Sequence, residues 1–269
     1  MITEREAHMN EYTDFAAVYD ELMDDIPYDS WADFTIQVLR EAGVRDGASI
    51  VELGCGTGAF TIRLARAGYD VTAIDFSSDM LSEAYNKAAD EALPVQFVCQ
   101  DMRSLELPCR YPAVVSFCDC INYILDEEEL SGVFRRVADA LEEGGCFFFD
   151  FNTRYKYETV MKDEVIAENR DDVSFIWENS YDPAENINEY DVTFFVRDSE
   201  SGDPDVFRRF EEIHLQKGYE WKTIRRMLER AGLSPVQAFD EYTGKPSSDT
   251  SERICVLAVK DTGKEHKIQ

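Results

Sequence analysis

The chain has 269 residues, of which 44% are hydrophobic and 12% aromatic, a composition that excludes a disordered, collagen-like or low-complexity protein. Its 55 acidic residues outnumber 27 basic ones, and the net charge of −28 repels nucleic acids and anionic membranes. The sequence contains no run of about 18 apolar residues, so no transmembrane helix is predicted. The polar segment over residues 1–10 does not resemble a signal peptide.

The 7 cysteines are scattered, and no CxxC pair is present. With only 3 histidines in the chain, a zinc or iron–sulfur site is not expected. Several cysteines lie within apolar runs, as buried free thiols do. We therefore expect no bound metal and a reducing compartment, the cytoplasm.

Residues 1–48 are expected to form a helical cap. Apolar residues recur three and four positions apart over residues 14–23 and 30–42, with Pro27 between the two helices and Ser30 as N-cap of the second. Short apolar runs then alternate with segments of helical spacing, which is typical of βαβ units in a parallel sheet. The pattern predicts strands over residues 49–53, 70–75, 95–99, 113–117 and 146–151, and helices over 58–67, 78–92 and 127–141. Ser77 or Ser78 caps the second of these helices, and Gly144 and Gly145 are expected to end the third.

The character of the chain changes after the core segment over residues 49–152. Residues 153–218 hold alternating segments separated by turn-like stretches, which predicts an antiparallel β insertion. The predicted strands of this insertion cover residues 173–177, 188–196 and 207–215. Residues 219–260 return to the core, with a helix over 220–231, strands over 234–242 and 253–260, and a polar tail over 261–269.

The densest motif is V-E-L-G-C-G-T-G over residues 51–58, between the first strand and the helix that follows. Glycines there let a ligand approach the backbone, and the helix N-terminus offers free amides with a partial positive charge. Gly54, Gly56 and Ala59 fit the spacing of a dinucleotide fold, and Asp75 lies where that fold has its acidic residue. The carboxylate of Glu52 argues against this interpretation, because it would repel a nearby pyrophosphate.

The stretch E-L-G-C-G-T-G resembles motif I of the class I S-adenosylmethionine-dependent methyltransferases. The order of elements from residue 30 to residue 260 is also similar to that family. The resemblance implies an α/β fold with a Rossmann-like seven-stranded sheet and helices on both faces. It also implies S-adenosyl-L-methionine as cofactor and S-adenosyl-L-homocysteine as product.

The same resemblance assigns roles to individual residues. The three motif glycines would pass under the methionine part and the ribose, and Glu52 would hold the amino-acid end. Asp75 would accept hydrogen bonds from both ribose hydroxyls, and Asp101 from the adenine amino group. The expected cofactor-binding residues are Tyr19, Trp31, Glu52, Gly54, Cys55, Gly56, Gly58, Asp75, Phe76, Asp101, Met102 and Phe117.

The acceptor site is expected beyond the carboxyl ends of the fourth and fifth strands, at F-C-D-C-I-N-Y and D-F-N-T. Methyl transfer from a sulfonium needs chiefly a positioned nucleophile and a route for its proton. The candidate catalytic residues are Asp119, as base or amine contact, and His214, as a base on an insertion strand. A third is Tyr19, in A-A-V-Y-D, which the resemblance places over the sulfonium. Arg154 and Tyr157 are further candidates for the acceptor pocket.

The stretches S-F-C-D-C-I-N-Y-I, D-F-N-T and A-A-V-Y-D resemble a bacterial branch of small-molecule methyltransferases that includes the amino-sugar N-methyltransferases. In that branch an antiparallel insertion helps to cover the acceptor site. Amino-sugar enzymes have an arginine soon after the tyrosine, whereas Asp24, Asp25 and Ile26 stand here. No [N/D]-P-P-[Y/F] run follows the fourth strand, and Cys118 and Cys120 lack the setting of a nucleophilic cysteine.

We therefore expect methyl transfer to an amine or hydroxyl of a small molecule, by a monomer or homodimer that binds neither nucleic acid nor membrane. Three alternatives stay open. An RNA or protein methyltransferase would need a positive groove beside the pocket. A non-catalytic module that binds S-adenosylmethionine would have a sealed acceptor side, and a dehydrogenase would hold a pyrophosphate on the glycine turn.

Overall fold

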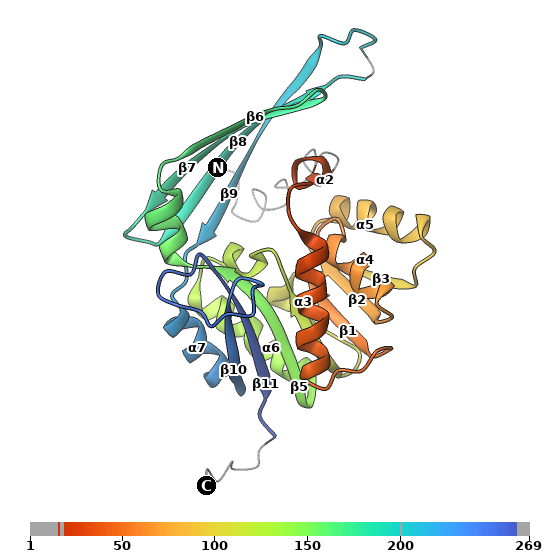
Figure 1. The fold of residues 1–269 in the computed structure, drawn as a ribbon, viewed down its shortest axis with the longest axis vertical. Coiled ribbons are helices and arrows are strands. Elements are labelled where there is room, and N and C mark those ends of the chain that lie inside the picture. Colours follow the sequence, from red (N-terminus) through yellow and green to blue (C-terminus); the bar gives the residue numbers. More distant parts are fainter. Residues whose placement is uncertain (1–15, 17–18, 200, 263–269) are drawn as a thin grey trace.

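The computed structural model describes residues 16, 19–199 and 201–262 (Figure 1). The first expected helix, over residues 14–23, is seen only from Tyr19 to Leu22, because most of its first half lies outside the described residues. The same holds for most of the expected polar tail over residues 261–269.

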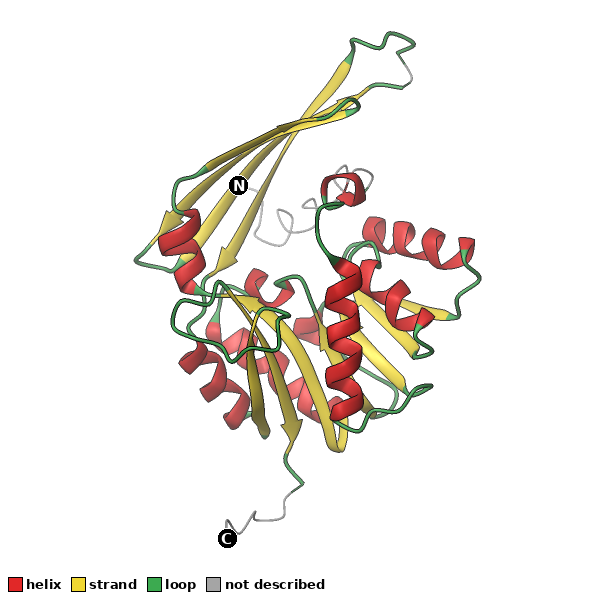
Figure 2. Ribbon diagram, in the orientation of Figure 1, coloured by secondary structure: helices red, strands yellow, loops and turns green. Residues whose placement is uncertain are grey.

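A seven-stranded sheet forms the centre of the molecule, in the order β10-β11-β5-β4-β1-β2-β3 (Figures 1 and 2). Strands β1 to β5 run parallel, whereas β11 runs antiparallel to both β5 and β10. The strands are Ser49–Leu53 (β1), Asp70–Asp75 (β2), Val95–Cys99 (β3), Tyr111–Ser116 (β4), Leu141–Asn152 (β5), Leu233–Asp240 (β10) and Arg253–Lys260 (β11). The α/β sheet expected from the sequence is thus confirmed.

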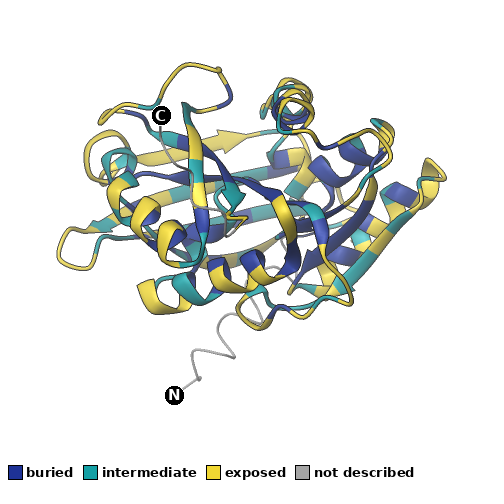
Figure 3. Cartoon of the chain, turned by 90° about the horizontal axis from the view of Figure 1, so that it is seen from below, coloured by how far each residue is buried: buried dark blue, intermediate teal, exposed yellow. Residues whose placement is uncertain are grey.

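Helices cover both faces of this sheet. They are α3 (Tyr28–Glu41), α4 (Ala59–Arg66), α5 (Ser78–Asp90), α6 (Glu127–Ala140) and α7 (Trp221–Arg230). The short helix α2 (Tyr19–Leu22) instead packs in the apolar cluster of the insertion sheet, and single helical turns cover Met102–Ser104, Cys120–Tyr123 and Lys156–Met161. Because side chains alternate along a strand, Val51 packs in the core that includes α6 and α7, and Ile50 in the core that includes α3 and α4. In β5, Phe147 and Phe149 lie in the first core and Phe148 in the second. Figure 3 shows the central strands buried between helices with exposed outer faces.

One of the two expected serine caps is confirmed and the other is wrong. The Ser77 hydroxyl accepts from the Met80 amide at 3.3 Å at the start of α5. Helix α3 begins at Tyr28, directly after Pro27, so Ser30 lies in its first turn instead of capping it. The Ser30 hydroxyl donates to the Pro27 carbonyl at 3.0 Å.

The expected glycine cap of α6 is also wrong. The helix ends at Ala140, and β5 begins at once with Leu141. Gly144 and Gly145 lie inside the strand, where the pairing of β5 with β4 shifts register between the pairs Tyr111–Leu141 and Ala113–Cys146. The glycines therefore form part of a β-bulge in β5, where Gly144 has a φ of 76°.

The insertion is a separate four-stranded antiparallel sheet in the order β6-β7-β8-β9. Its strands are Val165–Asn169 (β6), Val173–Asp182 (β7), Ile187–Arg197 (β8) and Phe207–Lys217 (β9). The sequence predicted three of them and missed β6, whose residues are all exposed and show no alternation. The sheet stands over the carboxyl ends of the parallel core strands (Figure 1). Among the described helices, none has the length and apolar character needed to cross a membrane.

Candidate active site

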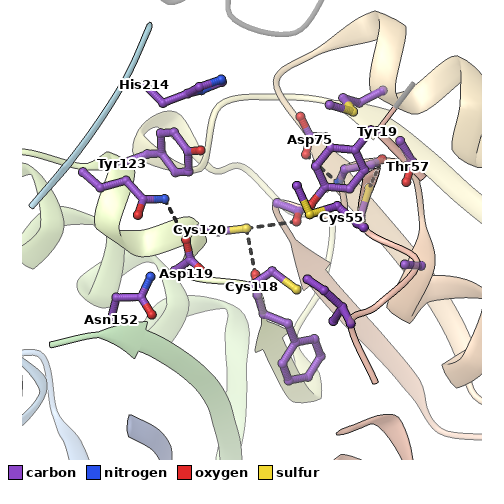
Figure 4. Close-up of a pocket in the computed structure, with 18 of the residues that line it drawn as sticks. Tyr19, Cys55, Thr57, Asp75, Cys118, Asp119, Cys120, Tyr123, Asn152 and His214 are labelled. Atoms are coloured by element: carbon purple, nitrogen blue, oxygen red, sulfur yellow. Dashed lines mark hydrogen bonds between the residues drawn. The ribbon is translucent and has the colours of Figure 1, made fainter. Parts of the chain in front are cut away.

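A cavity of about 500 Å³ lies between the carboxyl ends of the core strands and the insertion sheet. It brings together nearly all of the site residues expected from the sequence, which come from distant parts of the chain (Figure 4). The expected residues that line it are Tyr19, Trp31, Glu52, Gly54, Cys55, Gly56, Asp75, Phe76, Asp101, Met102, Phe117, Asp119 and His214. Gly58 is outside this lining and is the N-cap of α4.

The glycine loop after β1 requires glycine for two separate reasons. Gly54, Gly56 and Gly58 have φ values of 69°, 52° and 82°, in the left-handed region that side chains disfavour. A Cβ at Gly54 would lie 2.5 Å from the sulfur of Cys120, and one at Gly58 would lie 2.9 Å from the Cβ of Ala84. At Gly56 a Cβ would meet no described atom within 4 Å. The loop therefore leaves bare backbone at the cavity wall.

Asp75 ends β2 beside this loop and is 8% exposed. Its two carboxylate oxygens accept from the Gly56 amide at 2.8 Å and the Ser77 amide at 2.9 Å. Burial raises the pKa of Asp75, and these amide hydrogen bonds partly offset that rise. Each oxygen keeps a lone pair for a further donor in the cavity, such as a hydroxyl.

Glu52 lies deeper at the same wall and is 2% exposed. The Thr61 hydroxyl donates to its carboxyl group at 2.5 Å. Burial raises the pKa of Glu52 to about 8; the Thr61 hydrogen bond opposes this rise, and the charge of Asp75 adds to it. Without a cation beside it, this group is mostly neutral at pH 7.

Asp101 follows β3 and caps the turn that begins at Met102. Its carboxylate accepts from the Arg103 amide at 2.8 Å and forms an ion pair with the Arg103 side chain, also at 2.8 Å. The side chain therefore has a structural role in the turn beside the cavity that it lines.

Tyr19 and Trp31 are two of the aromatic residues through which the N-terminal segment lines the cavity. Tyr19 is in α2, and burial raises its pKa well above the ordinary value, so its phenol stays protonated. Trp31 of α3 stacks on Tyr242 with ring centroids 4.4 Å apart. The Arg253 guanidinium lies 5.3 Å from the centroid of the Trp31 ring, which fixes this indole by packing.

Asp119 belongs to a buried polar network, of which the sequence placed Asp150 in the expected acceptor segment D-F-N-T but did not indicate Arg253 or Gln216. Its two oxygens accept from Arg253 and from Gln216, each at 2.7 Å. Arg253 also donates to Asp150 at 2.7 Å. Asp150 in turn accepts from the Asp119 amide at 2.7 Å and the Cys118 amide at 3.2 Å.

This network stabilises an unusual backbone conformation at Cys118 and Asp119. Cys118 and Asp119 have φ values of 56° and 53°, two consecutive non-glycine residues in the left-handed region. Each such residue costs roughly 1–3 kcal/mol and needs support from its surroundings. Asp150 supplies that support by accepting from both amides, and the Tyr242 hydroxyl donates to the same carboxylate at 2.5 Å.

The network also sets the charge of Asp119. Burial alone would raise its pKa, but the positive charges of Arg253 and Lys156 outweigh burial and leave the pKa below its ordinary value. The carboxylate therefore stays ionised, and it is better suited to holding a cation or orienting an amine than to removing a proton.

Lys156 is a cavity residue that the sequence gave no reason to select. Its ammonium group donates to the Asn152 side-chain oxygen at 3.2 Å. Burial and the charge of Arg253 lower the pKa of Lys156, whereas the charge of Asp119 opposes this shift. The lowered pKa means that Lys156 gives up its own proton more readily than an exposed lysine does, and its neutral amine can accept a substrate proton.

His214 lies on β9 and is buried at the cavity wall. Its Nε2 atom is 3.2 Å from a Glu212 oxygen, and its ring meets Tyr123 edge-on at 6.0 Å. Arg154 and Tyr157 are not among the described residues that line the cavity, so their expected place in the pocket is wrong. The fully buried Tyr157 donates to Gln216 at 2.5 Å, and Arg154 forms a 2.9 Å ion pair with Glu158.

Comparison with known proteins identifies the family. A family model described as a methyltransferase domain matches residues 50–145. A solved S-adenosylmethionine-dependent methyltransferase from Clostridium acetobutylicum is 32% identical, with 93% of this chain and 99% of that chain covered and a TM-score of 0.83. The "putative methyltransferase" of Geobacillus sp. (strain WCH70) is 34% identical, over 93% of this chain and 99% of its own length. The chain belongs to the S-adenosylmethionine-dependent methyltransferases.

A more distant relative of this methyltransferase has a named substrate. The dTDP-3-amino-3,4,6-trideoxy-alpha-D-glucopyranose N,N-dimethyltransferase of Streptomyces venezuelae is 28% identical, over 70% of this chain and 76% of its own length. The Streptomyces venezuelae DesVI structure shares the fold, with a TM-score of 0.74 at 23% identity.

The cavity of the methyltransferase fits S-adenosylmethionine, the methyl donor of its family. Gly54 and Gly56 line the cavity with backbone that carries no side chain, and a Cβ at Gly56 would meet no described atom within 4 Å, so a ligand can approach the backbone there. Asp75 offers carboxylate lone pairs to hydroxyl groups from the adjacent strand end. The volume of about 500 Å³ lies within the range of small-molecule sites. The described residues contain no cluster of side chains that could hold a metal ion.

Proposed function

We propose that the methyltransferase transfers a methyl group to an amine or hydroxyl of a small molecule. The observation that carries this proposal is the continuity of one cavity from the glycine loop and Asp75 to the polar groups of Asp119, Lys156 and His214. A cavity covered by the insertion sheet suits a small acceptor better than a polymer. The net charge of −28 likewise favours a small molecule over RNA.

We expect the cofactor to be held by the residues that the resemblance named. When bound, S-adenosylmethionine supplies a methyl group activated by a positively charged sulfur. Asp75 would accept from the ribose hydroxyls, and the bare backbone at Gly54 and Gly56 would lie under the cofactor. Tyr19, whose phenol stays neutral, would present its electron-rich ring to the sulfonium.

The acceptor would be oriented and deprotonated by the polar groups at the other end of the cavity. Asp119, kept ionised by Arg253, would hold an amine or hydroxyl hydrogen. Lys156 would take the released proton at Nζ when its own amine is neutral, and its lowered pKa favours this state. The N,N-dimethyltransferase among the relatives is named for an amino sugar, which supports an amine as the attacking group.

The proposed compartment is the cytoplasm. All of the cysteines are free thiols, and Cys55, Cys146 and Cys255 are buried. Such a set of unpaired thiols is typical of proteins kept in a reducing environment.

A labelled-methyl assay tests the proposed activity. The enzyme is incubated with S-adenosylmethionine that carries a deuterated methyl group and with a panel of small amines and alcohols, and mass spectrometry detects the product. We expect labelled product from at least one free amine or hydroxyl. Labelled RNA or protein from a cell extract, with no labelled small molecule, would contradict the proposal.

Replacing Asp75 by alanine is expected to weaken binding of S-adenosylhomocysteine by roughly 1–3 kcal/mol, because ribose hydroxyls would lose their charged acceptor. Calorimetric titration measures this loss. The matched control is Asp79→Ala in the first turn of α5, an exposed carboxylate outside the cavity lining, which should bind as the wild type does. Equal affinities of the two variants would remove Asp75 from the cofactor site.

A further inference from the structure

The inner face of the insertion sheet gives the cavity an aromatic wall. Phe175 and Trp177 of β7 line the cavity together with Val192 and Phe194 of β8. Phe175 pairs with Phe194, and Trp177 with Val192, so these four side chains share one face of the sheet. Tyr190 continues the row toward His214, its partner on β9.

The rings of this wall support one another. Trp177 meets Tyr190 edge-on at 4.9 Å and an interplanar angle of 79°. Phe194 stacks on Phe210 of β9 at 5.0 Å. Rings fixed by such contacts form a preorganised apolar surface, which binds an apolar ligand without first having to be ordered. Leu22, Met23 and Met161 pack in the same apolar cluster as this wall and line the cavity together with Ile26.

The charges of the cavity do not suit an anionic acceptor. Among the described residues that line it, the side-chain cations are Arg103, Lys156 and Arg253. Arg103 is paired with Asp101, and Arg253 with two carboxylates. Of these three cations, only Lys156 forms no ion pair with a carboxylate of the described residues and could bind an anionic group. The field of a chain with a net charge of −28 also opposes the entry of a diphosphate.

One polar atom of the wall is buried beneath its surface. The indole nitrogen of Trp177 is buried and has no hydrogen-bond partner within the part of the chain that the structure describes. A buried donor without a partner is costly, and native proteins usually satisfy it with protein, water or ligand. Because this nitrogen has almost no exposed surface, the wall offers a ligand the faces of its aromatic rings and not the indole N–H group.

Resting on the proposed function, we propose that the acceptor is an uncharged or cationic molecule with an aromatic or similarly apolar body. That body lies against Phe175, Trp177 and Phe194, and the nucleophilic amine or hydroxyl is directed toward Asp119 and Lys156. The site would accordingly disfavour the sugar nucleotides for which the Streptomyces venezuelae relative is named.

A fluorescent probe tests the wall independently of catalysis. N-phenyl-1-naphthylamine is neutral and aromatic, and its emission rises in apolar surroundings. We expect it to bind the enzyme saturated with S-adenosylhomocysteine, and to bind Trp177→Ala at least about tenfold more weakly. Phe175→Ala should show a similar loss, and serves if Trp177→Ala folds poorly. Ile176→Ala is the matched control, since Ile176 lies between these residues on the opposite face and is 40% exposed.

Competition and turnover complete the test. Tyramine, a cationic aromatic amine, should displace the probe, and an amino-sugar nucleotide should not. Equal probe affinity in Trp177→Ala and Ile176→Ala, or displacement by the sugar nucleotide alone, would overturn the inference. Absence of labelled product from every amine and alcohol speaks against the proposed function instead, because probe binding needs no methyl transfer.

Discussion

The variant Arg253→Met is expected to lose about 3–5 kcal/mol of unfolding free energy, because removal of one partner leaves buried charges unpaired. The Arg253 side chain is 11% exposed and donates to both Asp119 and Asp150 at 2.7 Å. Asp150 is 1% exposed, so water cannot replace the lost donor. Methionine keeps an apolar stem beside Trp31, so the loss measures the charge more than the packing. Urea denaturation followed by circular dichroism gives the value.

A surface arginine supplies the control for this prediction. Arg40 forms a 2.9 Å ion pair with Asp46, and both side chains are more than half exposed. Exposed pairs contribute about 0–1 kcal/mol, so Arg40→Met should change stability little. Similar losses in the two variants would mean that the Arg253 network holds the fold no better than a surface ion pair does.

The variant Glu52→Gln is expected to stabilise the cofactor-free enzyme, increasingly so as the pH rises. The pKa of Glu52 is about 8 in the folded protein, whereas an unfolded glutamate titrates near pH 4.3. A raised pKa means that the folded state favours the neutral carboxyl, so this contribution to stability is complete below about pH 4 and is lost as the pH approaches 8. Glutamine stays neutral throughout and can still accept from Thr61.

Denaturation at several pH values measures this effect. The advantage of Glu52→Gln should be roughly 1 kcal/mol at pH 5 and grow to roughly 3–5 kcal/mol at pH 9, since each unit of pKa shift corresponds to about 1.4 kcal/mol. Stability curves that run parallel from pH 5 to pH 9 would show that Glu52 is ionised in the folded enzyme at neutral pH.

Local patterns in the sequence were sufficient to predict the core of the fold. The apolar runs of β1 to β5 and the glycine motif over residues 51–58 are short-range signals, and they located the cofactor end of the cavity. Capping was less predictable, because Ser30 and Gly144 have the residue types of caps while tertiary packing placed the helix ends elsewhere. Strand β6 had no apolar alternation to reveal it.

The acceptor end of the cavity could be predicted only in part: the sequence indicated Asp119 and His214, but not the contacts of Asp119 with Arg253. Arg253 meets Asp119 only because β11 pairs with β5 in a register that sets Arg253 opposite Asn152. Register between strands about a hundred residues apart is fixed by packing of the whole sheet, and no spacing rule records it. Lys156 was missed for a similar reason, since an isolated lysine after a strand resembles any surface lysine.

The strand order has a consequence for how the enzyme is made. Arg253 is supplied by the last strand, whereas the loop that it steadies through Asp150 belongs to the middle of the chain. During synthesis from the N-terminus, the cofactor half of the cavity can therefore be built long before the acceptor half. Catalytic competence would then be acquired only on arrival of the final strand, so that unfinished chains bind the methyl donor without being able to use it.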